Sequence, residues 1–216
     1  MKEIIITPQE INNDIIIQFS DDYIVEKNLV VDVPNQYEMI GYINGKVSFR
    51  ENDGRYIIYK INKDFLKKNF KVAFIKKKAL PDIIWGFGDI NVNNQRLKEC
   101  YRVGSNGTLQ FEIIDRVKLV DSFIWGKNIS VDMIKFKIIP VIKNIGADVL
   151  SKYFANTDVS VFEINSKLED IRIQLFNSLS NELIIKNMGL KVKSLVVNII
   201  HVNDDDLDII RNHING

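Results

Sequence analysis

The strongest constraint on the fold is a strictly alternating stretch near the middle of the chain. Between Gly107 and Asp115, apolar side chains occupy every second position: Leu109, Phe111 and Ile113. Polar side chains occupy the positions between them: Thr108, Gln110 and Glu112. A period of two predicts a strand with one buried and one solvated face. The chain must therefore build a sheet and something that covers one side of it.

A tryptophan lies upstream of this strand, in a short apolar run. The run Ile83-Ile84-Trp85-Gly86 is followed by a Gly-Phe-Gly break. A large ring beside a residue without a side chain is typical of a core tryptophan at a strand end, where the backbone bends. We expect Trp85 to be buried and not to bind a ligand.

The first half of the chain is predicted to form a meander of short strands. β-Branched and aromatic runs indicate strands at residues 4–6, 15–19, 29–33, 37–43, 47–49, 56–61 and 70–75. Asn44-Gly45 is a strong hairpin signal, because a type I′ turn needs positive φ at both positions. Asn52-Asp53-Gly54 predicts a second hairpin.

After Asp115 the pattern becomes helical. A single turn is expected at residues 121–126, followed by a helix from Asp132 to Phe154. Pro140 either kinks this helix or begins a new one. Ser166-Lys167-Leu168-Glu169 resembles a capping box, and the helix it would open carries one apolar stripe: Leu168, Ile171, Leu175, Leu179 and Leu183.

The end of the chain completes the predicted architecture. Gly189 suits the position just after a helix. Leu190–Val202 reads as a strand that is apolar on both faces, which predicts a central strand, and a short helix should begin near Asp204. The predicted class is α+β, with short antiparallel strands first and then helices packed on a mixed sheet closed by Leu190–Val202.

Composition excludes several classes of protein. The single cysteine, Cys100, cannot form an internal disulfide, which suits a reducing compartment. No apolar run approaches the ~20 residues of a membrane span, and the N-terminus does not resemble a signal peptide. Residues 41–103 hold fourteen basic and six acidic side chains, whereas residues 1–40 hold two basic and eight acidic ones. The basic character is thus confined to one segment.

The sequence offers little for catalysis. His201 and Asp204 could be read as a dyad, but the interpretation that we favour is a capped histidine at a strand end. Asp204, Asp206 and Asp208 begin like a calcium loop; Ile209 and Asn215 then replace its glycine and its glutamate. Acids at a helix start also suit the helix dipole. No zinc spacing or phosphate loop is present. We expect no catalytic residues, no cofactor and no metal ligands.

One charged feature stands out, a set of lysines in and around the strand at residues 70–75. Its members are Lys67, Lys68, Lys71, Lys76, Lys77 and Lys78. They could form a patch for anionic lipid, nucleic acid or an acidic partner. The interpretation that we favour is a solvated strand whose charges block edge pairing. We therefore expect at most a weak contact with anionic lipid, and no nucleic acid partner.

Several of these stretches together resemble a known family. They are Leu29-Val30-Val31, Asn35-Gln36, Asn44-Gly45-Lys46, Gly54-Arg55-Tyr56, Trp85-Gly86, Gly107-Thr108, Ile113-x-Asp115 and Phe123. Their order and spacing are similar to the SPFH domain of stomatin, prohibitin and flotillin, also called band 7. The closest group is the bacterial virion core protein-like SPFH proteins. The resemblance covers roughly residues 29–202.

The resemblance implies a function that composition alone does not. SPFH proteins are scaffolds that oligomerise and recruit or organise membrane-associated proteins, without enzymatic activity in the usual sense. By this resemblance, residues 29–216 form the domain and residues 1–28 are strands leading into it. The protein would be a homo-oligomer in the cytoplasm or peripherally attached to the inner face of the membrane. Two alternatives stay open: a soluble binding module with no membrane role, and an enzyme of unrecognised type.

Overall fold

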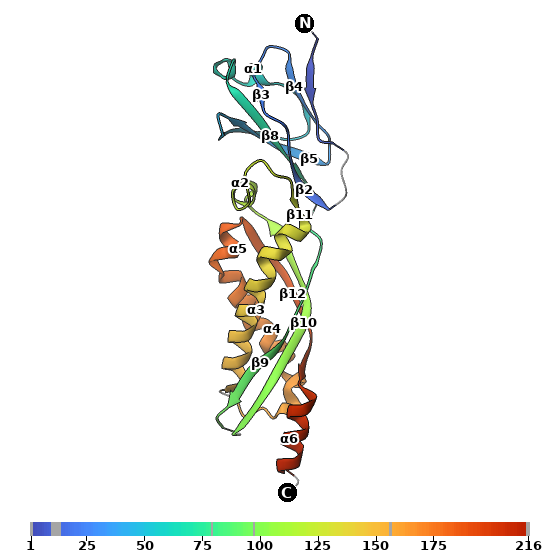
Figure 1. Cartoon of the computed structure of the whole chain (residues 1–216), viewed down its shortest axis with the longest axis vertical. Coiled ribbons are helices and arrows are strands. Elements are labelled where there is room, and N and C mark those ends of the chain that lie inside the picture. Colours follow the sequence, from blue (N-terminus) through green and yellow to red (C-terminus); the bar gives the residue numbers. More distant parts are fainter. Residues whose placement is uncertain (1, 10–13, 79, 97, 156, 215–216) are drawn as a thin grey trace. The chain divides into compact units, whose positions relative to one another are not determined.

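The computed structural model describes residues 2–9, 14–78, 80–96, 98–155 and 157–214, and confirms an α+β fold with three sheets (Figure 1). The chain forms two compact units. The first unit comprises Met1–Ala79 and Asp115–Ile134, and the second comprises Leu80–Ile114 and Lys135–Gly216. Each unit has its own sheet structure and is described separately below.

The first unit contains two sheets. One has the order β1-β4-β7, in which β1 is parallel to β4 and β7 is antiparallel to it. The other has the order β11-β2-β8-β5-β6, with β3 also paired to β8. The strands are β1 (Ile4–Ile6), β2 (Ile15–Phe19), β3 (Tyr23–Ile24), β4 (Leu29–Val33), β5 (Tyr37–Ile43), β6 (Lys46–Glu51), β7 (Gly54–Ile57), β8 (Asn69–Lys76) and β11 (Ile129–Ser130).

Residues 1–28 supply three strands, and all three pair with strands from later in the first unit. Strand β1 pairs with β4, and β2 and β3 pair with β8. The early strands therefore complete the sheets of the first unit. In β2, Ile16 and Ile17 are buried, whereas in β1 only Ile6 is buried.

Two local expectations in the first unit are not met. Residues Asn52–Gly54 do not close a hairpin, because β6 pairs with β5 and β7 pairs with β4, so the chain passes from one sheet to the other there. The strand expected to reach Ile61 ends at Ile57 and is followed by helix α1 (Ile58–Ile61). Ile58 is fully buried in the core of this unit, and that burial overrides the strand preference of the run.

Another local expectation of the first unit is confirmed, and one element is shifted along the chain. Asn44 and Gly45 both have positive φ, 50° and 76°, in the turn that joins β5 to β6. The single turn expected at residues 121–126 forms earlier, as α2 (Arg116–Asp121). Asp115 explains the shift, because its carboxylate accepts hydrogen bonds from the backbone N–H groups of Val117 and Lys118, at 3.0 and 3.2 Å. A 3₁₀ turn, η1 (Lys63–Phe65), precedes β8.

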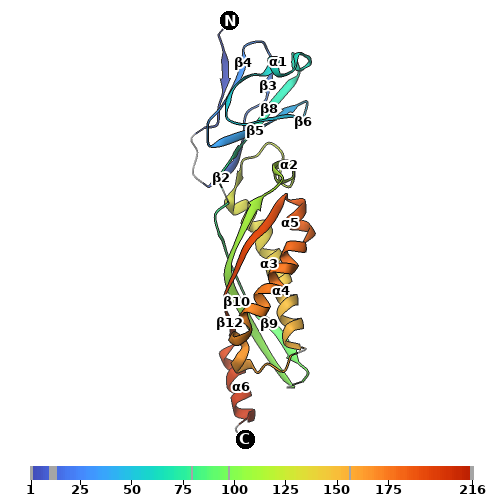
Figure 2. The same ribbon diagram turned by 180° about the vertical axis from the view of Figure 1, so that it is seen from behind.

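The second unit is one antiparallel sheet with helices on one side. The sheet order is β12-β10-β9, and both pairings are antiparallel, so this sheet is not mixed as expected. Helices α3 and α4 lie on the same side of it (Figures 1 and 2). The elements are β9 (Ile83–Asn94), β10 (Glu99–Ile113), α3 (Val131–Ala155), η2 (Val161–Lys167), α4 (Leu168–Asn181), α5 (Leu183–Asn187), β12 (Leu190–Val202) and α6 (Asp204–Ile214).

Trp85 is buried in the core of this unit, as predicted, with 2% of its surface exposed. It does not stand at a strand end, because β9 continues through Gly86 and Gly88 to Asn94. The ring has room because Gly107 lies opposite: a Cβ there would stand 2.6 Å from Trp85 Cζ2 and 1.9 Å from the carbonyl oxygen of Val196. The glycine is therefore required by close packing of three strands.

Strand β12 lies at an edge of the sheet, not at its centre. Its apolar run from Leu195 to Ile200 suggested burial on both faces. In the structure, one face is buried, whereas Val196 and Ile199 are 50% and 43% exposed. A run of β-branched residues favours a strand whether or not its outer face is covered by other elements. The pattern therefore could not distinguish a central strand from an edge strand.

The helices of the second unit differ from expectation at their ends. Ser166 does not act as the N-cap of α4. Its hydroxyl donates instead to the carbonyl of Glu163 within η2, at 2.7 Å. The apolar stripe holds for Ile171, Leu175 and Leu179, which are buried. Leu168 is half-buried.

A break in the chain explains where the stripe ends. Glu182 is extended, and its carboxylate accepts from the N–H of Ile184 to start α5. Leu183 therefore belongs to α5 and is 68% exposed. Gly189, with φ of 68°, follows α5 as predicted. Helix α3 continues through Pro140, so no new helix begins there.

The buried stripe of α4 should carry much of the stability of the second unit. Leu175→Ala is expected to lower the free energy of unfolding by about 2–5 kcal/mol, because it leaves a cavity between α4 and the sheet. Ile173→Ala, on the exposed side of the same helix, should change it by less than about 0.5 kcal/mol. Denaturant unfolding of both variants measures this. Equal effects of the two substitutions would contradict the packing.

The close approach at Gly107 gives a second expectation. Gly107→Ala should destabilise the protein by about 1–3 kcal/mol or more, because the methyl group would overlap the Val196 carbonyl. Gly88→Ala is the matched control in the neighbouring strand, since nothing lies within 4 Å of its Cβ position. It should be neutral or stabilise by up to about 1 kcal/mol. Thermal unfolding compares the pair, and a stable Gly107→Ala variant would refute the contact.

Candidate interaction site

The six lysines do not gather on one surface. Lys67 and Lys68 precede β8, and Lys77 and Lys78 follow it. Strand β8 has eight residues, so its two ends lie about 25 Å apart. The lysines therefore form two groups at opposite ends of the strand, with Lys71 between them.

Several of these charges are already paired. Lys71 Nζ lies 3.1 Å from Asp22 Oδ2, and only 15% of the Lys71 side chain is exposed. Lys77 forms an ion pair with Asp53 and holds the pKa of that carboxyl below its ordinary value. Lys76 also has an interaction partner. This arrangement does not favour simultaneous binding of all six lysines to one anionic surface. Weak contact with anionic lipid stays a prediction.

His201 lies near the end of β12, and Cys100 lies near the start of β10. His201 is exposed, and its ring lies over Gly104; the side chain of His213 lies outside the described part. Cys100 is exposed. Over the described residues, no group of three or more His, Cys, Asp or Glu side chains could hold a metal ion.

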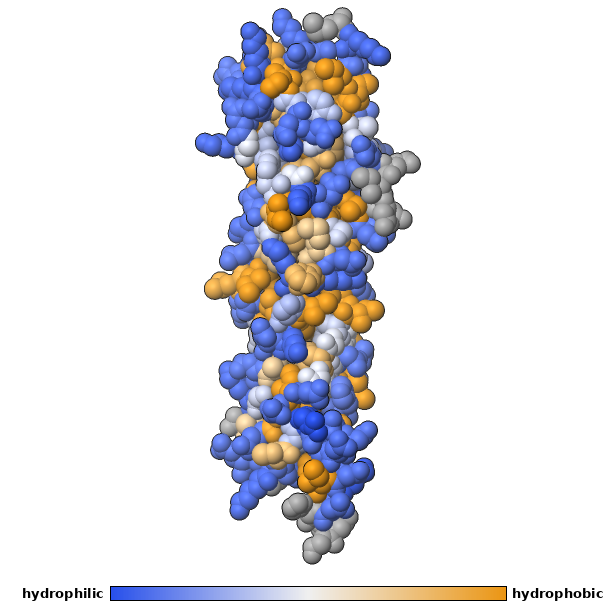
Figure 3. Space-filling view, viewed as in Figure 1, coloured by the Kyte–Doolittle hydropathy of each residue, from blue (hydrophilic) through white to orange (hydrophobic). Residues whose placement is uncertain are grey.

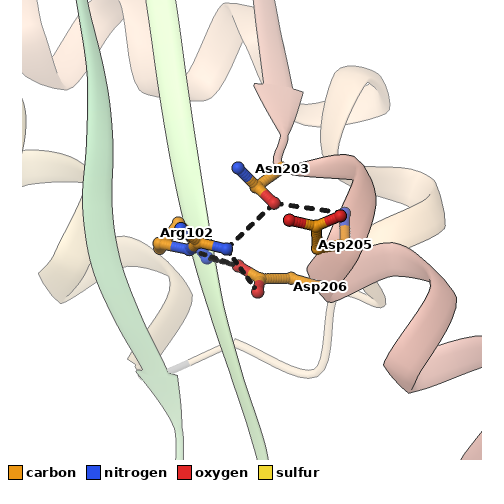
Figure 4. Close-up of polar contacts among 4 residues, drawn as sticks. All are labelled: Arg102, Asn203, Asp205 and Asp206. Carbon is orange, nitrogen blue, oxygen red and sulfur yellow. Dashed lines mark hydrogen bonds and ion pairs between the residues drawn. The ribbon is translucent and has the colours of Figure 1, made fainter.

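The aspartates at the start of α6 have a structural partner that sequence reasoning did not identify. Arg102, in β10, grips Asp206 through three contacts (Figure 4): its Nε and its backbone N–H donate to Oδ2 at 3.0 and 2.7 Å, and its Nη2 donates to Oδ1 at 3.0 Å. The same Nη2 donates to Asn203 Oδ1 at 3.0 Å. We refer to Arg102, Asn203 and Asp206 as the β10–α6 junction.

Electrostatics keep the β10–α6 junction ionised. The hydrogen bond from Arg102 lowers the pKa of Asp206 from its ordinary value of 3.8. In turn, Asp206 raises the pKa of Arg102. A bidentate guanidinium–carboxylate pair also restricts orientation, because both groups are planar. The pair therefore fixes direction as well as proximity.

The β10–α6 junction determines how α6 leaves the sheet. Asn203 Oδ1 also accepts from the N–H of Asp205 at 3.1 Å, as a helix N-cap. Farther along α6, Ile210 is 6% exposed, and the Arg211 guanidinium lies 5.7 Å from the centre of the Phe162 ring. Helix α6 is thus docked at its start and along one side. The N-cap spacing from Asn203 to Asp206 was visible in the sequence, but the partner a hundred residues away was not.

A second surface lies on the face of the sheet that carries exposed side chains. Thr108 pairs with Ile84 on one side and Val196 on the other, so the three residues form a row across β9, β10 and β12. Ile84 is 78% exposed and Val196 is 50% exposed. We call the two exposed hydrophobic residues, Ile84 and Val196, the apolar row.

Hydrogen bonds join the polar side chains in the row next to the apolar row. Gln110 donates to Asp82 at 2.7 Å and accepts from Ser194 at 2.9 Å. Side chains bridged in this way hold the face rigid beside the apolar row. In the view of Figure 3, hydrophobic residues form separate patches divided by hydrophilic side chains.

Comparison with known proteins identifies the family of this chain. The model of the SPFH domain-Band 7 family matches residues 63–213, which include β8 and every strand and helix of the second unit up to α6. The chain belongs to this SPFH domain-Band 7 family. A comparison with curated proteins finds no match. None of the helices in the described part of this SPFH protein is long and apolar enough to cross a membrane.

The β10–α6 junction predicts a pH-dependent docking of α6. Because the folded-state pKa of Asp206 is lowered, the ion pair contributes stability above pH 3.8 and loses it as the pH falls through the lower, folded-state pKa. Asp206→Asn should speed amide hydrogen exchange of α6 at pH 7 and remove this pH dependence.

Asp208→Asn is the control, since it removes the same charge from the same helix without touching Arg102. It should leave the exchange rates of α6 almost unchanged. If the two variants exchange at equal rates, the β10–α6 junction does not hold the helix.

Proposed function

We propose that this SPFH protein is a non-enzymatic scaffold that self-assembles and recruits or organises membrane-associated partners, with any attachment to the membrane being peripheral. Family membership over residues 63–213 carries this proposal. The apolar row adds a physical reason for association, because it is an exposed hydrophobic surface on a rigid sheet.

The strength of one such contact can be estimated. Burying a Val or Ile side chain that was exposed is worth about 1.5–3 kcal/mol. Ile84 and Val196 are each already partly buried, so together they contribute less than twice that amount. A stable interface needs about 1,000 Å² or more of buried surface, so the polar groups around the apolar row must take part. We therefore expect each contact to be weak and assembly to depend on several contacts together.

A soluble binding role without a membrane is the second candidate, and the pairing of Lys71 with Asp22 and of Lys77 with Asp53 favours it, because it leaves fewer lysines for anionic lipid. Co-sedimentation with liposomes separates the two. Binding to anionic liposomes at low salt that disappears as salt rises supports a peripheral role through lysines such as Lys67, Lys68 and Lys78. Absence of binding to either anionic or neutral liposomes supports the soluble module.

Self-assembly is tested by light scattering coupled to gel filtration. Wild-type protein should elute with a mass greater than that of one chain, and Val196→Lys should shift it toward the monomer, because a charge cannot be buried unpaired in an apolar contact. The control is Ile173→Lys, which places the same charge at a similarly exposed position, 45% against 50%, on α4. A monomeric wild-type protein at all concentrations would overturn the self-assembly, and equal effects of the two variants would exclude the apolar row.

A further inference from the structure

The first unit contains a pocket that the family relationship does not explain. Its volume is about 470 Å³, within the range of ordinary ligand sites. The residues that carry the argument are Asp22, Tyr42, Asn44, Asn69, Lys71 and Trp125. They come from the end of β5, the β5–β6 turn, the start of β8, and the loops before β3 and β11.

One wall of the pocket is a tryptophan in a fixed position. The ring of Trp125 meets the ring of Tyr42 edge-on, with centroids 4.3 Å apart, and meets Phe19 in the same manner at 5.2 Å. Tyr42 is 2% exposed, whereas Trp125 remains 43% exposed. An indole that is held by two rings and still faces solvent has already lost its conformational entropy. Tryptophans of this kind are typical anchors of protein recognition sites.

The charges at the pocket cancel each other. The Lys71 ammonium is paired with Asp22 at 3.1 Å, and Gly126 lies over it, with its Cβ position 3.2 Å from Lys71 Nζ. The Asp22 carboxylate balances this cation and would repel a phosphate or carboxylate ligand beside it. The pocket is therefore suited to a ligand without net charge.

Asn44 and Asn69 supply carboxamide groups at the rim, and hydrogen bonds hold the backbone of these two residues together. Asn44 and Asn69 are held together, because the N–H of Asn44 donates to the carbonyl of Asn69 at 2.9 Å and the N–H of Asn69 donates to Asn44 Oδ1 at 3.2 Å. Carboxamides can both donate and accept hydrogen bonds. They match the alternating N–H and C=O groups of a polypeptide main chain.

We propose that this pocket binds an uncharged peptide segment of a partner protein, with an aromatic or aliphatic side chain packed on Trp125 and main-chain amides at the Asn44–Asn69 rim. The proposal rests on the recruiting part of the proposed function and names the chemistry of the recruited partner. It does not depend on self-assembly, because all of the pocket residues belong to the first unit.

The test uses a single blocked amino acid, N-acetyl-phenylalaninamide, with the full-length Val196→Lys protein to limit self-association. The chain has two tryptophans, and Trp85 is buried in the second unit, so a change in fluorescence reports on Trp125. We expect a saturable change with a dissociation constant in the millimolar range. N-acetyl-alaninamide, which has the same amides without the ring, should bind at least fivefold more weakly.

Variants locate the binding. Trp125→Ala should weaken binding of N-acetyl-phenylalaninamide at least tenfold when followed by NMR, whereas Phe136→Ala, at an 81% exposed aromatic of the second unit, should not. Asp22→Asn keeps the fold intact, since the Asp22 side chain is 78% exposed, and frees the charge of Lys71. This variant should bind N-acetyl-phenylalanine, with its free carboxylate, more tightly than the amide, reversing the wild-type order.

Four results would overturn the proposal. Saturation by methyl glucoside with no response to N-acetyl-phenylalaninamide would indicate a carbohydrate site, and preference of the wild-type protein for inorganic phosphate would indicate an anion site. Equal binding of the alanine and phenylalanine probes would exclude recognition of an apolar side chain. The fourth is no saturation by any probe up to its solubility. Failure of self-assembly appears separately, in the light scattering of the wild-type protein.

Discussion

The close approach of three strands at Gly107 is the constraint on which the second unit depends. The ring of Trp85 and the carbonyl of Val196 both occupy space that a side chain at residue 107 would fill. Because this contact brings β12 against β10, it also places the buried face of β12 under α4, where Ile171, Leu175 and Leu179 close the core. The alternation of buried and exposed residues along β10 then determines which side chains remain on the other face.

The features that bear on function lie outside these cores. The β10–α6 junction uses charge to set the direction of a helix, and the apolar row uses the exposed face of the same sheet. In the first unit, pairing of Lys71 with Asp22 converts what looked like part of a basic patch into an uncharged pocket wall beside Trp125. In each case an interaction between distant parts of the chain determines whether a side chain is available to a ligand or a partner. A scaffold needs surfaces of this kind more than it needs a catalytic cleft.

Membership of the SPFH domain-Band 7 family does not specify these surfaces. The family model covers residues 63–213 and thus begins after most strands of the first unit. The pocket draws Asp22, Tyr42 and Asn44 from the part of the chain before that match. The pocket therefore combines residues from before the family match with Asn69, Lys71 and Trp125 from within it.

The sequence by itself determined the α+β class, most of the strands, the Asn44-Gly45 turn, the burial of Trp85 and the stripe of α4, because periodicity and turn chemistry are local. The sequence did not predict that β12 lies at an edge of its sheet, that the chain crosses from one sheet to the other at Asn52–Gly54, or that α4 ends before Leu183. Each of these features depends on which distant residues compete for the same backbone hydrogen bonds or for the same space in the core. The same limit applies to the sites. The lysines and aspartates were visible as charges, but only the tertiary structure paired Lys71 with Asp22 and Arg102 with Asp206, because the energy of a charge depends on its neighbours in space.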